Sequence, residues 1–238
     1  MPSALFGWPD QGLSLDIAVH LGTLLAVIVY LRRDLIALIR GFLLRITGRG
    51  DSPESRLAVQ LIIATLPAGI AGLLLHSHPL VSSRSIVVVG VTSIVFAFVL
   101  WIADIRAAQR STALSTKELT LGAALFIGFA QALAIIPGTS RSGVTLTAAR
   151  LLGMDRTSAA RFSFLLSIPI IMAAGLLLLI EARDQTLDWF LLGYGAAVSA
   201  LFALLTIHYF LRLLPKVGVV PFVIYRILFG LFLLLWLG

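Results

Sequence analysis

The sequence predicts an all-α membrane protein with several transmembrane helices. Hydrophobic residues make up 59% of the 238 residues and charged residues only 12%, whereas a soluble domain carries about 25% charge. Long apolar runs recur along the chain, and none shows the strict alternation of a half-buried strand. Apart from Arg226, the basic residues behind the net charge of +7 lie between these runs. This positive-inside pattern argues against nucleic-acid binding.

Seven apolar runs have lengths typical of membrane helices. They cover residues 15–31, 57–75, 85–102, 119–136, 162–180, 189–211 and 217–237. No Lys or Arg precedes the first run, and the first basic residue, Arg32, follows it. We therefore interpret this run as a mature span rather than a signal peptide. No linker divides the chain, so we expect one membrane domain, residues 1–238.

The fourth run ends in a break rather than in a loop. Pro137 and Gly138 interrupt the helix, and the polar residues Thr139, Ser140, Arg141 and Ser142 follow. A shorter run, residues 143–152, then ends at Gly153, a typical helix stop. The sequence therefore predicts two helices joined by a polar break over residues 119–153.

Loop charges predict how this segment sits in a bilayer. Residues 32–56 hold six arginines against three acidic residues, so we expect this loop in the cytoplasm. A solvated loop and a segment that lies along the anionic cytoplasmic leaflet are equal alternatives for it. If residues 119–136 crossed the bilayer fully, Arg150, Arg156 and Arg161 would lie on the outer side, against the rule that basic loops face the cytoplasm. A re-entrant hairpin at 119–153 returns them to the cytoplasm. We therefore predict six spans, one re-entrant helix hairpin, and both termini outside.

This topology contains an inverted repeat. Three spans before the hairpin form one half, residues 1–103, and three spans after it belong to the other, residues 119–238. Folds of this kind place a polar site near the midplane, where broken helices meet. A matching hairpin is expected before the first half, and Met1 leaves no room for it.

The break carries the groups of a phosphate site. Arg141 at membrane depth needs an anionic partner, and its planar fork suits phosphate oxygens. The helix that follows presents free N–H groups and a positive dipole end. Ser140, Ser142 and Thr145 add hydroxyl groups, while Gly138 and Gly143 allow close backbone approach. Arg226 lies inside the last span, where substrate contact and a helix–helix bond are equal alternatives.

The run Pro137-Gly-Thr-Ser-Arg-Ser-Gly-Val-Thr145 resembles the PGxSRSxxT signature of the undecaprenyl-diphosphate phosphatases, the bacitracin-resistance family. The resemblance extends to Gln131-Ala-Leu-Ala before the signature, to residues 161–169 after it, to residues 15–27 in the first span, and to Tyr225-Arg226. It covers nearly the whole chain. It implies an enzyme that removes the terminal phosphate of undecaprenyl diphosphate and recycles the lipid carrier for peptidoglycan synthesis.

The resemblance also implies the parts of the site. We predict a catalytic group of Ser140, Arg141 and Thr145, and a substrate-binding group of Gly138, Thr139, Ser142, Gly143, Gln131 and Arg226. The expected partner is a polyprenyl diphosphate in a bacterial inner membrane, reached from the outer face. Whether the chain forms a homo-oligomer is left open. The expected cofactor is a divalent cation, magnesium or calcium, with no metal ligand assigned in these residues.

One family motif has no counterpart in these residues. The family carries an earlier re-entrant segment, E-x-x-x-E-F-L-P-[IV]-S-S followed by a His, whose acidic groups bind the metal. No Glu precedes Glu54 here. Either the start codon is assigned too late or the chain is a trimmed paralogue, and we expect weak lipid binding with phosphate release near background. The alternatives are an inverted-repeat lipid or anion transporter, a flippase, or a catalytically incomplete paralogue.

Overall fold

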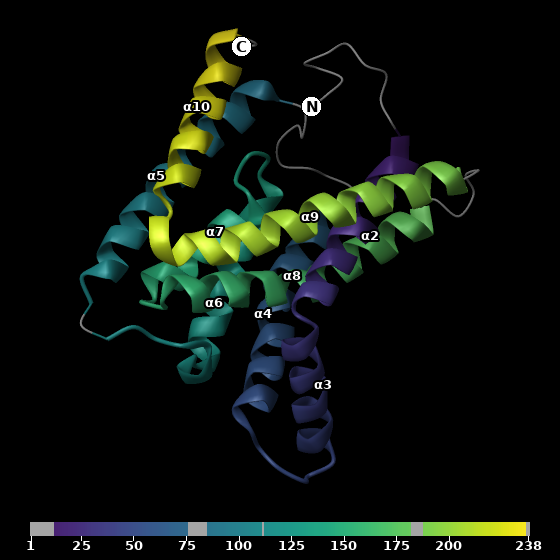
Figure 1. Ribbon diagram of the computed structural model, residues 1–238, viewed down its shortest axis with the longest axis vertical. Helices are drawn as coiled ribbons and strands as arrows, with labels where there is room; N and C mark the ends of the chain where they lie inside the picture. The colour runs from purple at the N-terminus through teal and green to yellow at the C-terminus, as the bar shows by residue number, and fades with distance from the viewer. Residues whose placement is uncertain (1–11, 76–84, 111, 182–187, 237–238) are drawn as a thin grey trace.

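The computed structural model describes residues 12–75, 85–110, 112–181 and 188–236, and this part of the chain is helical without a strand (Figure 1). The helices are α2 (Gly12–Tyr30), α3 (Arg32–Ile46), α4 (Pro53–Leu75), α5 (Ile86–Ala108), α6 (Leu121–Ala132), α7 (Arg141–Leu151), α8 (Arg156–Glu181), α9 (Trp189–Val217) and α10 (Val220–Trp236). Two 3-10 turns, Thr116–Glu118 and Leu133–Ile135, flank α6.

The lengths of these helices confirm a polytopic membrane protein. Four of them, α4, α5, α8 and α9, are long and apolar enough to cross a bilayer, and α2 with α3 makes a fifth candidate bent by 80°. The apolar segments Leu121–Ile135 and Val220–Trp236 are shorter. The count of six spans and the placement of the termini stay predictions. Residues 1–11 and 237–238 lie outside the described residues.

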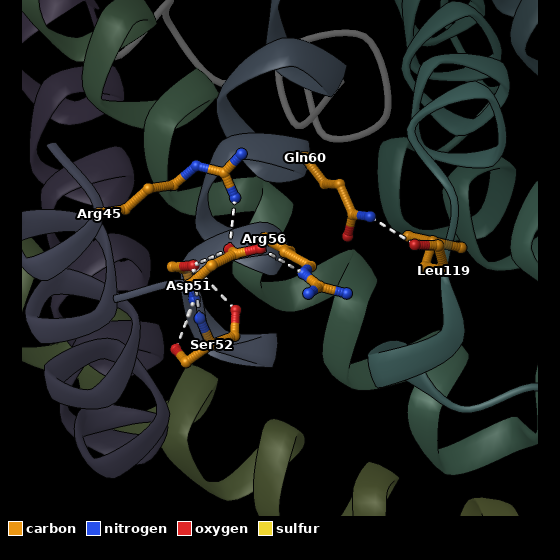
Figure 2. Close-up of polar contacts among 7 residues, drawn as sticks. Arg45, Asp51, Ser52, Arg56, Gln60 and Leu119 are labelled. Carbon is orange, nitrogen blue, oxygen red and sulfur yellow. Dashed lines mark hydrogen bonds and ion pairs between the residues drawn. The ribbon is translucent and has the colours of Figure 1, made fainter. Parts of the chain in front are cut away.

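The loop predicted over residues 32–56 contains a helix, which is a correction. Helix α3 does not appear as an uninterrupted apolar run, because arginines recur among its leucines and isoleucines. The turn after α3 is built around Asp51, which accepts hydrogen bonds from Arg45 at 2.7 Å, Arg56 at 2.9 Å and Ser55 at 2.9 Å (Figure 2). The hydrogen bond from Ser55 is the largest cause that lowers the pKa of Asp51 below its usual 3.8, and the hydrogen bond from Arg56 is the second largest. These hydrogen bonds therefore favour the ionised form of Asp51.

Close helix crossings organise the rest of the molecule. Helices α5 and α10 run side by side, and α2 lies along α9 (Figure 1). At each crossing a glycine faces backbone: a Cβ on Gly22 would lie 2.3 Å from the Ala196 carbonyl oxygen, and one on Gly230 would lie 2.7 Å from that of Gly90. Small residues let helix backbones approach in a membrane, where water drives no association between apolar surfaces.

The segment from α6 to α7 doubles back on itself. Its two ends meet, because the Leu114 N–H donates to the Gly153 carbonyl at 3.0 Å and the Asp155 N–H donates to the Leu114 carbonyl at 3.1 Å. Arg110 adds bonds to the carbonyls of Leu151 and Leu152. Figure 2 shows Gln60 of α4 donating to the Leu119 carbonyl, which ties the start of the hairpin to α4. The segment from α6 to α7 therefore begins and ends at the same place in the molecule.

Ion pairs join the segments that carry the predicted cytoplasmic charges. Asp104 of α5 accepts from Arg150 at 2.8 Å and from Arg156 at 2.7 Å, and the side chains of Asp104 and Arg150 are each only 5% exposed. Arg161 of α8 pairs with Asp34 of α3 at 2.9 Å. All these segments therefore lie at one end of the molecule. The re-entrant placement of residues 119–153 in a bilayer stays a prediction.

Candidate functional site at the helix break

The helix break has a backbone that only certain residues adopt. Gly138 has φ +83°, and a Cβ there would lie 2.2 Å from the Thr92 hydroxyl oxygen. Ser140 has φ +66°, and it is the only non-glycine residue with positive φ in the described part of the chain. Its hydroxyl caps α7 by accepting from the Gly143 N–H at 3.3 Å. Strain of this kind persists only where the surroundings impose it, and it is typical of functional sites.

Neighbouring helices hold the break through its carbonyl groups, which have no helical partners. From α5, Thr92 donates to the Pro137 carbonyl at 2.6 Å and Ser93 donates to the Gly138 carbonyl at 3.3 Å. From α10, Arg226 Nη2 donates to the carbonyls of Gly138 at 2.8 Å and Thr139 at 2.9 Å. The irregular backbone is therefore satisfied by protein, as membrane depth requires.

A cavity of about 540 Å³ opens beside the break, between α5, α7, α8, α9 and α10. One part of its wall is polar and includes Ser140, Ser142, Gly143 and Arg226. Another part is aromatic and consists of Phe164, Phe210, Phe222, Tyr225 and Phe229. A cavity with these two parts suits a molecule that carries both an anionic group and an apolar chain.

Arg226 performs two tasks in this cavity. Its Nη2 holds the break, whereas its buried Nη1 has no hydrogen-bond partner among the described residues. The Nη1 lies against the start of α7, because a Cβ on Gly143 would be only 2.6 Å away from it. An unpaired guanidinium N–H beside a helix N-terminus is a donor available to an anion. The predicted alternatives for Arg226, a structural bond and a ligand contact, are therefore compatible.

The remaining predicted residues do not line this cavity. Thr145 is fully buried, and its hydroxyl lies 2.6 Å from that of Ser163 and donates to the Arg141 carbonyl at 3.0 Å. That hydroxyl therefore binds α7 to α8. Gln131 and Thr139 are also buried, and their side-chain polar atoms have no partner in the described part of the chain; the same holds for Nη1 of Arg141. The structure thus brings Gly138, Ser140, Ser142, Gly143 and Arg226 together, and places Gln131, Thr139, Arg141 and Thr145 outside the cavity lining.

Four polar residues of the site were not predicted from the sequence, and one of them is Thr206 of α9, which lines the cavity. Thr92 and Ser93 lie within the apolar run of α5, and Ser163 lies at the start of the apolar run of α8. Hydroxyl groups in such runs form hydrogen bonds within their own helix or to a neighbouring helix. Sequence spacing alone does not distinguish these two kinds of hydrogen bond. The available signal was the adjacent Thr92-Ser93 pair, which is polar on two successive helix positions.

The described residues do not supply a ligand set for the divalent cation that the resemblance implies. Among them no group of three or more His, Asp or Glu side chains lies close enough to hold an ion. Asp104, the buried carboxylate among the described residues, lies at the other end of α7 and is already bonded to Arg150 and Arg156. We therefore derive no chemical step through a metal, and the cation stays a prediction.

The fold is that of a polytopic helical membrane protein, and its cavity has one polar and one aromatic part. Residues 1–232 match the family described as bacitracin resistance protein BacA, and the chain belongs to this family. An undecaprenyl-diphosphatase of Saccharophagus degradans is 51% identical over 99% of this chain and 89% of its own length. Undecaprenyl-diphosphatases of Alcanivorax borkumensis and Hahella chejuensis are 48% and 50% identical, each over 100% of this chain and 89% and 88% of their own lengths.

Proposed function

We propose that the chain hydrolyses undecaprenyl diphosphate to undecaprenyl phosphate and inorganic phosphate at the outer face of a bacterial inner membrane. The observation that carries the proposal is the two-part cavity, in which Arg226 and the N-terminus of α7 face the same space as five aromatic side chains. The polar part suits a diphosphate, and the aromatic part suits the first isoprene units of the lipid. The names of the relatives support the same substrate.

In the proposed reaction an oxygen nucleophile, water or a serine hydroxyl, attacks the terminal phosphorus and would lose its proton to solvent while the bond to the bridging oxygen breaks. If a serine attacks, water then cleaves the phosphoserine and releases inorganic phosphate. The lipid phosphate leaves with that oxygen. Negative charge grows on the leaving oxygen, and charge is spread over the three oxygens of the transferred phosphoryl group. Arg226 Nη1, the N–H groups at the start of α7 and the Ser142 hydroxyl would stabilise this charge from fixed positions, which requires little rearrangement during the reaction. Arg141 lies outside the cavity lining, so its part in the reaction stays a prediction and no contact with the diphosphate is assigned to it.

The test is release of inorganic phosphate from undecaprenyl diphosphate by the purified chain in vesicles. Arg226→Gln should lower the release at least tenfold, because an ionic hydrogen bond is worth about 1.5–3 kcal/mol. Arg161→Gln is the matched control, since Arg161 is exposed and its ion pair among the described residues is with Asp34 alone. We expect that control to stay within twofold of the unmodified chain.

The competing functions give different results in the same vesicles. Binding of the lipid without release of phosphate would indicate an incomplete paralogue. Transfer of intact lipid diphosphate between leaflets, again without release, would indicate a transporter. Either result would reject the hydrolase proposal for this chain.

A further inference from the structure

Helix α3 has an exposed apolar face that no described residue covers. Its other face is used in folding: Leu38 and Gly41 are buried, and a Cβ on Gly41 would lie 2.8 Å from the backbone nitrogen of Ser55. Opposite them, Ile36 is 65% exposed, Ile39 51% and Leu43 52%. Residues three and seven positions apart lie on one side of a helix. These three side chains therefore form one stripe, which we call the α3 stripe.

Arginines accompany the stripe. Arg40 and Arg49 line, together with all three stripe residues, a shallow hollow of about 400 Å³. Neither forms a salt bridge within the described residues, whereas Arg45 on the same helix pairs with Asp51 at 2.7 Å. The surface thus combines apolar side chains with two guanidinium groups that have no carboxylate partner in the described part of the chain. Its position also suits a membrane surface, because Asp34 of α3 pairs with Arg161 at the end of the molecule where the charged segments meet.

We propose that the α3 stripe, with Arg40 and Arg49, binds an anionic phospholipid of the leaflet at that end of the molecule. One acyl chain would lie along Ile36, Ile39 and Leu43, and the headgroup phosphate would accept hydrogen bonds from the two guanidinium groups. Helices with an apolar face and arginines beside it bind anionic bilayers through both contributions. A symmetric contact between two copies of the stripe would instead bring like charges together, which disfavours a second copy as the occupant.

The proposal is independent of the catalytic site and can be tested on the full chain. The sequence contains no cysteine, so a single cysteine at Thr47, which also lines the hollow, can carry an environment-sensitive fluorophore. The labelled protein is reconstituted in phosphatidylcholine vesicles containing increasing fractions of phosphatidylglycerol. Emission should shift to the blue as phosphatidylglycerol increases, because the fluorophore enters a less polar lipid environment.

Matched variants identify the groups responsible. An arginine near an anionic leaflet contributes about fivefold to lipid affinity, so the double variant Arg40→Gln/Arg49→Gln should bind phosphatidylglycerol roughly twenty-five times more weakly and lose most of the blue shift over the same titration. Arg45→Gln removes the same charge from a paired position and should leave the titration within twofold. An equal effect of Arg45→Gln would overturn the proposal. The proposal would also be overturned if the emission of the labelled chain with all its arginines followed protein density instead of phosphatidylglycerol, or did not change at all. Both of these outcomes are independent of whether the variants fold.

Discussion

Gly138 makes the turn at the break possible, both through its positive φ and through the space that it leaves for Thr92. Gly138→Ala should lower stability by roughly 2–4 kcal/mol, from backbone strain and from the clash with Thr92 and Val89. Gly69→Ala is the control, because a Cβ there meets nothing within 4 Å. The control should be neutral or slightly stabilising in a helix. Thermal unfolding in detergent measures both, and equal melting temperatures would contradict this account of the turn.

Ser140 combines a cap, a strained backbone and a hydroxyl in the cavity, and two substitutions separate these contributions. Ser140→Ala loses the cap and keeps the strain, at a cost of about 1 kcal/mol, whereas Ser140→Gly loses the cap but relieves the strain, so its cost is a few tenths. Both lack the hydroxyl. Unfolding temperatures should therefore differ between the two variants, while phosphate release should fall equally. Recovery of release in Ser140→Gly alone would mean that the hydroxyl has no part in the reaction.

At the scale of elements, the hairpin from α6 to α7 predicts which loops share a side of the membrane. Because Leu114 bonds to Gly153 and to Asp155, single cysteines at Gly50 and Ser158 should react with an impermeant thiol reagent from the cytoplasmic side only. A cysteine at Trp189, which is 78% exposed at the start of α9, should react from the opposite side. Labelling of Ser158 and Trp189 from one side would exclude a hairpin that returns to its starting face.

The sequence allowed the elements to be predicted better than their contacts. Pro137 and Gly138 interrupt a helix by their own chemistry, so the break and the helix after it could be placed without a structure. Helix α3 was missed because amphipathic patterns are weaker than apolar runs. The partners of the break on α5 could not be predicted, since Thr92 lies 45 residues from Pro137 and chain separation does not encode proximity.

At the scale of the whole molecule, Asp104 connects α5, the hairpin and α8. Asp104→Asn should lower stability by about 3–5 kcal/mol, because it leaves two arginines without their common carboxylate, and Arg150 is buried. Asp34→Asn removes the exposed pair with Arg161 and should cost less than about 1 kcal/mol. Unfolding temperatures of the two variants provide the comparison. A loss for Asp104→Asn no larger than that for Asp34→Asn would show that water reaches this ion cluster.

The cluster around Asp104 also has a consequence for biosynthesis. Asp104 is made 46 residues before Arg150, which at about 5–20 residues per second is a delay of roughly 2–9 s. During that interval the carboxylate must remain in water, so the end of α5 cannot take its final position until α7 has been synthesised. Ribosome-bound chains that end before Arg150 should expose a cysteine at Ala103 to thiol reagents, and chains that include α8 should protect it. Protection of the Ala103 cysteine in the shorter chains would mean that α5 reaches its final position before α7 and α8 have been synthesised.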